Sequence, residues 1–380
     1  MFSTTLERHP NIARIATRMI FLSAGFITAA WAALIPFVKT NVQINDGMMG
    51  ILLLCLGAGA LVGMPIAGWC TAKFGCQKVL LISVVSFSLI FPALLSTQSP
   101  IILALILVAF GLCIGITDCA MNIQAVIVEK SAHEPLMSGF HGFYSLGGMV
   151  GALVLTGLFS VGVTAAYACM LTSVLMLILL AVSHRGLLAN KASENGPYFA
   201  LPRGEVILIG VVCFVFFLAE GSVLDWSGIF LTEYRNVPLS SAGMGVASFS
   251  VAMTIGRLFG DRLISFIGAK RMVVLGASIA IIGFLLSLLV TFWQSALVGY
   301  ALIGLGCANI VPIMFSATGK QHIMSESLAV TAVSTLGYIG VLAGPALLGF
   351  GAQMFSLSTA LYGVVTLVSI AIILSIKIKL

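Results

Sequence analysis

The chain has 380 residues, of which 60% are hydrophobic and only 8% are charged. A soluble domain carries about 25% charged residues, so this composition excludes a soluble globular protein and indicates an integral membrane protein. The formal net charge is +6.

Apolar runs long enough to cross a bilayer, about 20 residues each, follow one another along the chain. We predict twelve spans at 19–38, 48–69, 78–97, 101–128, 136–159, 163–183, 206–231, 241–260, 272–291, 294–316, 327–351 and 356–376. The separation of the ninth span from the tenth rests on the short break Thr291–Gln294. The pattern therefore predicts an all-α membrane protein with twelve transmembrane helices.

The basic residues predict how the chain is oriented. Arg8, Arg14 and Arg18 precede the first span, which no small-residue cleavage site ends, so we expect no cleaved signal peptide. With both termini inside, only Lys39 and Arg235 of the 18 Lys and Arg fall in external loops. Basic residues concentrate on the cytoplasmic side. The net charge is thus a feature of topology, and we expect no nucleic-acid partner.

The eight cysteines form no pattern typical of a metal site, and none falls in a predicted external loop. We interpret them as small buried residues without disulfides. Neither a nucleotide-binding loop nor a metal-ligand cluster is evident, so we expect no cofactor and no metal. ATP-driven transport and an intramembrane enzyme are disfavoured for the same reason.

The fourth predicted span contains a carboxylate at an unfavourable depth. Asp118 lies eleven residues before Glu129, where the apolar run ends, so it is roughly 16 Å from that end and near the middle of the bilayer. A charged Asp there costs about 2.5–3.5 kcal/mol on insertion scales. We expect it to carry function, with Asn122 one turn away on the same face. The alternative is a protonated or hydrogen-bonded packing residue.

An internal repeat divides the chain into two halves. Six pairs of glycines stand at one offset of 193 residues: Gly50 and Gly243, Gly63 and Gly256, Gly75 and Gly268, Gly111 and Gly304, Gly147 and Gly340, and Gly151 and Gly344. A repeat of this kind is typical of transporters built from parallel halves. We predict an amino-terminal half at 1–184, a polar cytoplasmic linker at 185–204 and a carboxy-terminal half at 205–380.

Two six-helix halves with such a linker resemble the major facilitator superfamily over the whole chain. The superfamily's loop after the second helix, G-x-x-x-D-[RK]-x-G-x-[RK]-[RK], is similar to GWCTAKFGCQK at 68–78, although Ala72 replaces the Asp. The second-half counterpart contains Asp-Arg at 261–262. The resemblance implies a cytoplasmic gate formed by Lys73, Lys78, Arg257, Asp261 and Arg262. The alternative is an ordinary basic loop beside the membrane.

A finer resemblance concerns the fourth, fifth and seventh helices. The segment DCAMN at 118–122 resembles the carboxylate-x-Ala-x-Asn segment of the fucose permease branch, whose members are proton-coupled sugar symporters. GFHGFYSLG at 139–147 and EGSVLDW at 220–226 extend that resemblance. The first helix departs from it, because Ala32 stands where the fucose permease has a carboxylate before Pro36.

The repeat places a carboxylate at the equivalent position of the seventh helix, since Asp225 lies 193 residues after Ala32. We propose Glu220 and Asp225, in addition to Asp118, as proton-coupling candidates. Five residues turn a helix by roughly 140°, so Glu220 and Asp225 cannot share a face of a regular helix. An interfacial position is the alternative for Asp225.

Further polar and aromatic residues are candidates for solute binding: Asn122, His141, Tyr144, Ser145, Trp31, Asn309 and Tyr338. His141 can also relay protons, because histidine titrates near neutral pH. Packing at a helix contact is the alternative for His141, and the interfacial aromatic belt is the alternative for Trp31.

These observations predict a major facilitator fold and a secondary active transporter. We expect proton-coupled symport of a small polar solute, such as a sugar, by alternating access in a bacterial inner membrane. The protein's partners would be the solute, protons and the lipid bilayer, and we expect a monomer. Proton-driven efflux of drugs or metabolites is one alternative. A solute-sensing membrane receptor that does not translocate its ligand is another.

Overall fold

The computed structural model describes residues 10–44, 46–189, 201–238 and 243–380, and in these residues helices are joined by loops without a β-strand. The first six helices are α2 (Pro10–Val42), α3 (Asp46–Phe74), α4 (Cys76–Ala93), α5 (Pro100–Ala132), α6 (Met137–Ser160) and α7 (Ala165–Ser183). The others are α8 (Glu205–Ile229), α9 (Met244–Ile267), α10 (Ala269–Leu289), α11 (Trp293–Cys307), α12 (Ile310–Thr318), α13 (Glu326–Met354) and α14 (Leu357–Ile376).

The transmembrane helices agree with the spans that the sequence predicts. Among the described residues, eleven helical stretches are long and apolar enough to cross a membrane, and α11 and α12 together form one of them, Trp293–Thr318. The twelfth span is α9, which is less apolar because it carries Arg257, Asp261 and Arg262. The predicted break between the ninth and tenth spans is present between α10 and α11. The division of the tenth span into α11 and α12 was not predicted.

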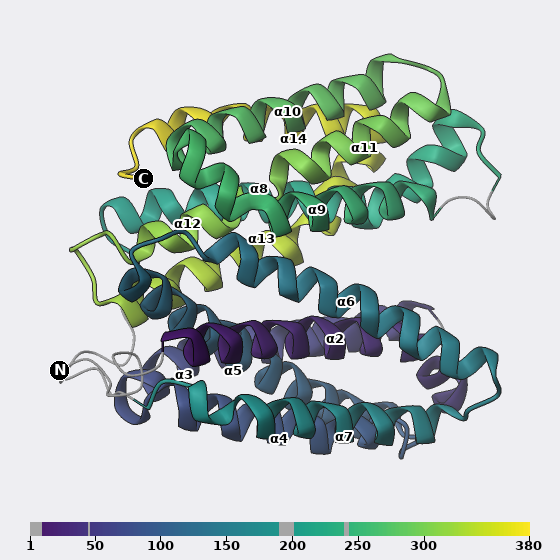
Figure 1. Ribbon diagram of the computed structural model, residues 1–380. Helices are drawn as coiled ribbons and strands as arrows, with labels where there is room; N and C mark the ends of the chain where they lie inside the picture. The colour runs from purple at the N-terminus through teal and green to yellow at the C-terminus, as the bar shows by residue number, and fades with distance from the viewer. Residues whose placement is uncertain (1–9, 45, 190–200, 239–242) are drawn as a thin grey trace. The chain divides into compact units, whose positions relative to one another are not determined.

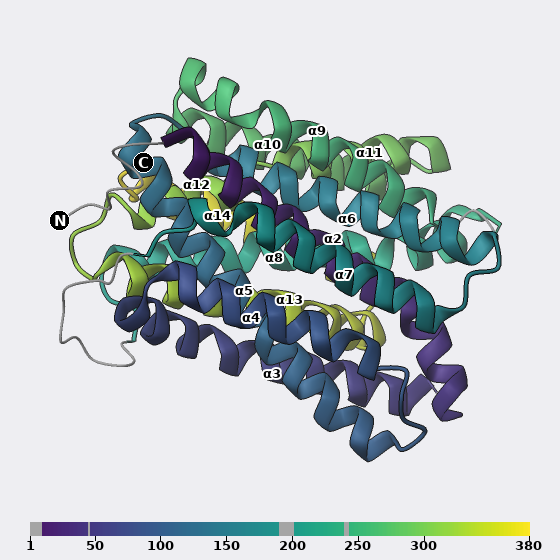
Figure 2. The ribbon, with the colours of Figure 1, turned by 60° about the horizontal axis from the view of Figure 1, so that its bottom comes forward.

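Packing groups the helices into two units. The first comprises Met1–Ala132 and Phe143–Ala200, and the second comprises His133–Gly142 and Leu201–Leu380. Their boundary at 200–201 lies inside the segment 185–204 predicted as the linker, of which 190–200 falls outside the described residues. In the first unit α3 packs along α5 (Figures 1 and 2). In the second, α8 packs along α13 and α9 along α11 (Figure 1).

The 193-residue repeat is also a repeat of contacts. A Cβ atom on Gly111 of α5 would collide with the carbonyl oxygen of Leu56 on α3, and one on Gly304 of α11 would collide with that of Phe249 on α9. Leu56 and Phe249 stand at the same 193-residue offset. Each unit therefore brings two helix backbones together at an equivalent glycine, as small residues do in membrane helices.

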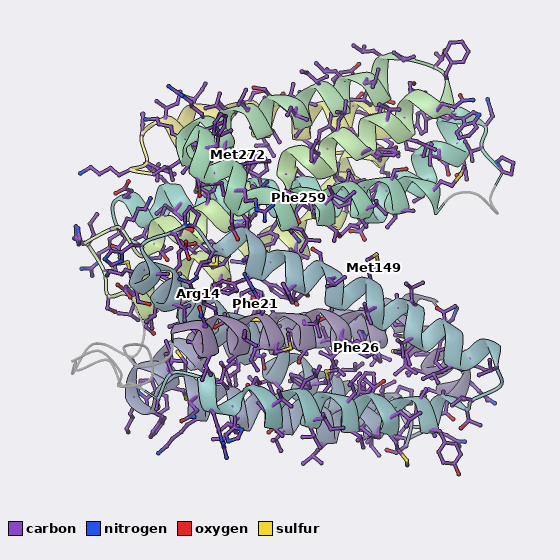
Figure 3. All side chains as sticks on the ribbon, in the orientation of Figure 1. Arg14, Phe21, Phe26, Met149, Phe259 and Met272 are labelled. Atoms are coloured by element: carbon purple, nitrogen blue, oxygen red, sulfur yellow. The ribbon has the colours of Figure 1, made fainter. Side chains whose placement is uncertain are left out.

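Side chains between the helices of each unit are large and apolar. Phe21 and Phe26 project from α2 into the first unit (Figure 3) and are 0% and 2% exposed. Phe91 of α4 and Phe110 of α5 pack with ring centroids 5.8 Å apart. Exposed aliphatic residues such as Ile82, Leu89 and Leu105 face outward, which is the pattern of helices surrounded by lipid.

The glycine contacts generate a stability prediction. Gly304→Ala should destabilise the protein by about 1–3 kcal/mol, because the added methyl group forces α11 away from α9. Gly363→Ala on α14 is the matched control, since a Cβ there meets nothing within 4 Å. We expect a lower Tm of the detergent-purified protein for the first variant and an unchanged Tm for the second. Equal Tm values would contradict the close approach.

Candidate functional site

Asp118 lies in the middle of α5 and is partly exposed. Its carboxylate makes no hydrogen bond or ion pair with any residue that the structure describes. Asn122 is 1% exposed and donates from Nδ2 to the backbone carbonyl of Asp118 at 2.9 Å, while Asn122 Oδ1 has no partner among the described residues. The amide thus lies beside Asp118, as expected, but bonds its backbone and leaves the carboxylate uncompensated.

Other polar side chains of α5 are satisfied by their neighbours. Thr117 donates to the Ser83 hydroxyl at 2.9 Å or to a backbone carbonyl of its own helix. Gln124 donates from Nε2 to the Thr17 hydroxyl at 3.0 Å and accepts from the Leu188 backbone N–H at 3.1 Å. Asp118 thus differs from Thr117 and Gln124, whose side chains are bonded to neighbouring helices or segments.

Two further candidates of the first unit lie in different environments. Trp31 is 6% exposed and packs at a tilt on Phe110, with ring centroids 6.3 Å apart, so its ring is part of the core. Tyr144 is half-buried on α6 and donates to the Thr28 hydroxyl of α2 at 3.4 Å. Ser145 follows it and is also half-buried. Tyr144 and Ser145 are thus partly exposed, whereas the Trp31 ring is buried in packing.

Glu220 of α8 and Arg257 of α9 form a buried ion pair in the second unit. Arg257 Nη2 donates to Glu220 Oε2 at 3.4 Å, and the residues are 6% and 8% exposed. The second oxygen, Oε1, has no partner among the described residues. Glu220 was predicted as a coupling carboxylate and Arg257 as a gate residue. The structure joins them, which sequence reasoning missed because the residues are 37 positions apart.

The junction between α11 and α12 lies against this pair. Arg257 Nε donates to the carbonyl oxygen of Ala308 at 3.2 Å. Asn309 is 1% exposed and donates from Nδ2 to the Gly256 carbonyl of α9 at 3.1 Å. A Cβ on Gly260 would collide with Asn309 Oδ1. Asn309, a predicted solute-binding residue, therefore connects the junction to α9.

His141 and Asp261 both make contacts within the second unit. The His141 ring is 8% exposed and stacks on Phe315 of α12, with centroids 5.7 Å apart. Asp261 Oδ2 accepts a hydrogen bond from the backbone N–H of Gly139, in the first turn of α6, at 2.9 Å. A carboxylate at a helix N-terminus is favoured by the helix dipole.

The other predicted residues are spread over different surfaces. Asp225 is exposed although Glu220 is buried, and α8 continues through both, as expected for residues on different faces. Lys73 lies over the rings of Trp69 and Phe74, 5.1 and 5.4 Å from their centroids. The remaining candidates are Lys78 and Arg262, which are exposed, and Tyr338, which is half-buried on α13.

Arg235, one of the two basic residues predicted outside, has a structural role. It follows the π-helical segment Phe230–Tyr234 that extends α8. Its Nη2 donates to the carbonyl oxygens of Ser287 and Leu288 at 2.6 and 3.0 Å. These carbonyls belong to the last turn of α10, where a helix lacks its own donors.

Comparison with known proteins supports this architecture. The family model described as Major Facilitator Superfamily matches residues 19–248. An uncharacterized MFS-type transporter of Yersinia pestis is 45% identical over 365 residues, which cover 96% of this chain and 95% of that protein. The membrane protein MosC of Rhizobium meliloti is 30% identical, covering 90% of this chain and 84% of that protein.

A solved structure shares the fold at low sequence identity. The crystal structure of a variant of the E. coli fucose:proton symporter FucP superposes with a TM-score of 0.78 over 96% of this chain and 97% of that chain. The sequences are 14% identical.

The Gly139–Asp261 hydrogen bond generates a prediction about the start of α6. Asp261→Ala removes the acceptor and should speed hydrogen exchange of the Gly139 amide, with a loss of about 0.5–2 kcal/mol typical of a lost helix cap. Asp261→Asn keeps an oxygen acceptor. It should therefore lose only the part of this free energy that comes from the negative charge at the helix N-terminus, which is the smaller part. Exchange rates measured by mass spectrometry test this. An Asp261→Ala variant with wild-type exchange at Gly139 would show that the bond contributes nothing.

Proposed function

The chain belongs to the Major Facilitator Superfamily of membrane transporters, and we propose that it is a secondary active transporter that couples uptake of a small polar solute to protons. The transported solute would be uncharged and hydroxylated, such as a sugar. The two units would move relative to one another during transport and expose the solute pathway alternately to the two sides of the membrane.

The observation that carries the proposal is the uncompensated carboxylate of Asp118. An ionisable group inside a membrane span is by default a functional one, because an isolated charge there is unfavourable. Asp118 has no ion-pair partner among the described residues, unlike Glu220, which Arg257 neutralises. A carboxyl group of this kind binds or releases a proton according to the water that reaches it, and this is what a coupling site requires.

Asn122 supports a link between the proton and the solute. It lies one turn from Asp118, and its Oδ1 has no hydrogen-bond partner among the described residues. A solute hydroxyl is a donor of the right chemistry for this oxygen. We propose that Asn122, Tyr144 and Ser145 contact the solute beside Asp118. FucP, whose structure shares this fold, is a fucose:proton symporter, which is consistent with a sugar as the solute.

The other carboxylates have lesser roles in this proposal. Asp225 is exposed near the outer end of α8 and would meet protons on the external side. Glu220 is paired with Arg257 and would serve that contact. Asp118 is therefore the coupling residue to test first.

We further propose a bacterial inner-membrane location with both termini in the cytoplasm. The orientation follows from the basic residues, of which only Lys39 and Arg235 fall in external loops. In a Cys-less background, Gln98→Cys, between α4 and α5, should react with an impermeant maleimide added to intact cells. Lys320→Cys, after α12, should react only after permeabilisation. Both side chains are exposed, so burial cannot explain a difference. The reverse labelling pattern would invert the topology.

The solute has to be found before coupling can be measured. A thermal-shift screen of the purified protein against sugars, nucleosides, amino acids and cationic drugs, at two pH values, should identify a ligand by a raised Tm. A ligand among the sugars supports the proposal. A ligand among the cationic drugs would instead favour proton-driven efflux.

Asp118→Asn tests the coupling itself. The amide mimics a permanently protonated carboxyl, so proton-driven accumulation of the identified solute in proteoliposomes should be lost, while solute binding and exchange persist. Glu233→Gln is the control, because it makes the same kind of change at an exposed carboxylate that no described residue pairs with. It should leave accumulation at the wild-type level. Wild-type accumulation by Asp118→Asn would remove Asp118 from the mechanism.

A further inference from the structure

Pro312 removes a backbone hydrogen-bond donor from the tenth span. In a continuous helix the N–H of residue 312 would donate to the carbonyl oxygen of Ala308, but proline has no N–H. The helix is interrupted here, since α11 ends at Cys307 and α12 begins at Ile310. The Ala308 carbonyl therefore lacks its helical donor inside a membrane span, where an unsatisfied backbone group is costly.

Arg257 supplies the missing donor from another helix. Its Nε–H bonds the Ala308 carbonyl at 3.2 Å, and its Nη2 contacts Glu220 at 3.4 Å. Glu220 in turn neutralises the guanidinium, which is 6% exposed. The Ala308 carbonyl thus receives from Arg257 the hydrogen bond that Pro312 cannot donate. The guanidinium of Arg257 in turn receives its counter-charge from Glu220.

The neighbouring contacts hold the same junction. Asn309 donates to the Gly256 carbonyl on α9, and Gly260 leaves the space that Asn309 Oδ1 occupies. Beyond the junction, α12 carries Phe315, on which His141 stacks. The junction that precedes α12 is therefore held against α9.

We infer that Arg257, anchored by Glu220, is a positioning residue that braces the α11–α12 junction, and that α12 is a hinged inner segment of its span. This assignment replaces coupling by Glu220 and gating by Arg257, which the sequence alone favoured. It goes beyond the proposed function and does not rest on it, because neither a solute nor a proton enters the argument.

The ion pair is tested first by a double-mutant cycle on the purified protein in detergent. Glu220→Gln and Arg257→Met each leave one partner buried without compensation, so both should lower the Tm by several degrees. The double variant removes both charges and should be more stable than either single variant. If Glu220 is instead a coupling carboxyl that is stable when protonated, Glu220→Gln should keep the wild-type Tm, and this result would overturn the brace.

Pro312→Ala then tests the hinge. In the Glu220→Gln/Arg257→Met background the Ala308 carbonyl has lost its hydrogen-bond donor. Amides of α12 should therefore exchange with deuterium about tenfold faster than in the wild type. Adding Pro312→Ala restores an N–H at position 312 and should return exchange in α12 to the wild-type rate. No return of the rate, or faster exchange spread evenly over all helices, would contradict the inference.

Arg235→Met provides the matched control for these measurements. Arg235 also donates to backbone carbonyls at a helix end, those of Ser287 and Leu288 on α10. It follows the π-helical segment that extends α8, and its partners do not belong to the α11–α12 junction. Its loss should lower the Tm and speed exchange at the end of α10. Exchange in α12 should stay at the wild-type rate, and Pro312→Ala should not rescue the Tm. A Tm raised by Pro312→Ala in the Arg235→Met variant would show that Pro312→Ala stabilises the protein in general, and this would contradict the inference.

Discussion

Inside the hydrocarbon layer of a bilayer, backbone polar groups and charges have to find their partners within the protein. Most of the contacts described above are responses to this constraint. Gln124 is satisfied by Thr17 and Leu188, and Arg235 compensates for the end of α10. Arg257 does the same for the carbonyl that Pro312 leaves without a donor. Helices that carry glycine, proline and charged residues are tolerated in the membrane because neighbouring helices supply what they lack.

The same constraint separates the two carboxylates that lie deep in the spans. Glu220 has a counter-charge 3.4 Å away and serves the packing of its unit. Asp118 has none among the described residues: Thr117 bonds to Ser83, and the Asn122 amide donates only to the backbone carbonyl of Asp118. A charge that is compensated stabilises one arrangement of helices. A charge that is left uncompensated responds to water and protons, which is why Asp118 is the stronger candidate for coupling.

The two units share their scaffold but differ in their chemistry. Equivalent glycines bring α5 to α3 and α11 to α9 at matching carbonyls. At the positions of the candidate charged groups the match is lost, since Val311 is the counterpart of Asp118 and Met64 that of Arg257. Close backbone packing tolerates little change, whereas a polar side chain can be gained or lost in one half. The repeat therefore predicts the architecture of each unit and not its reactive residues.

The sequence by itself determined the spans, the repeat and the family resemblance, because long apolar runs and spaced glycines are local properties of the chain. It also made Asp118 a candidate from its depth alone. It could not pair Glu220 with Arg257 or place Trp31 and Asn309 in packing contacts. Helices of this chain are apolar on most faces, so periodicity does not show which face meets which neighbour. Only the tertiary structure decided these contacts, because they depend on the rotation of each helix against helices distant in sequence.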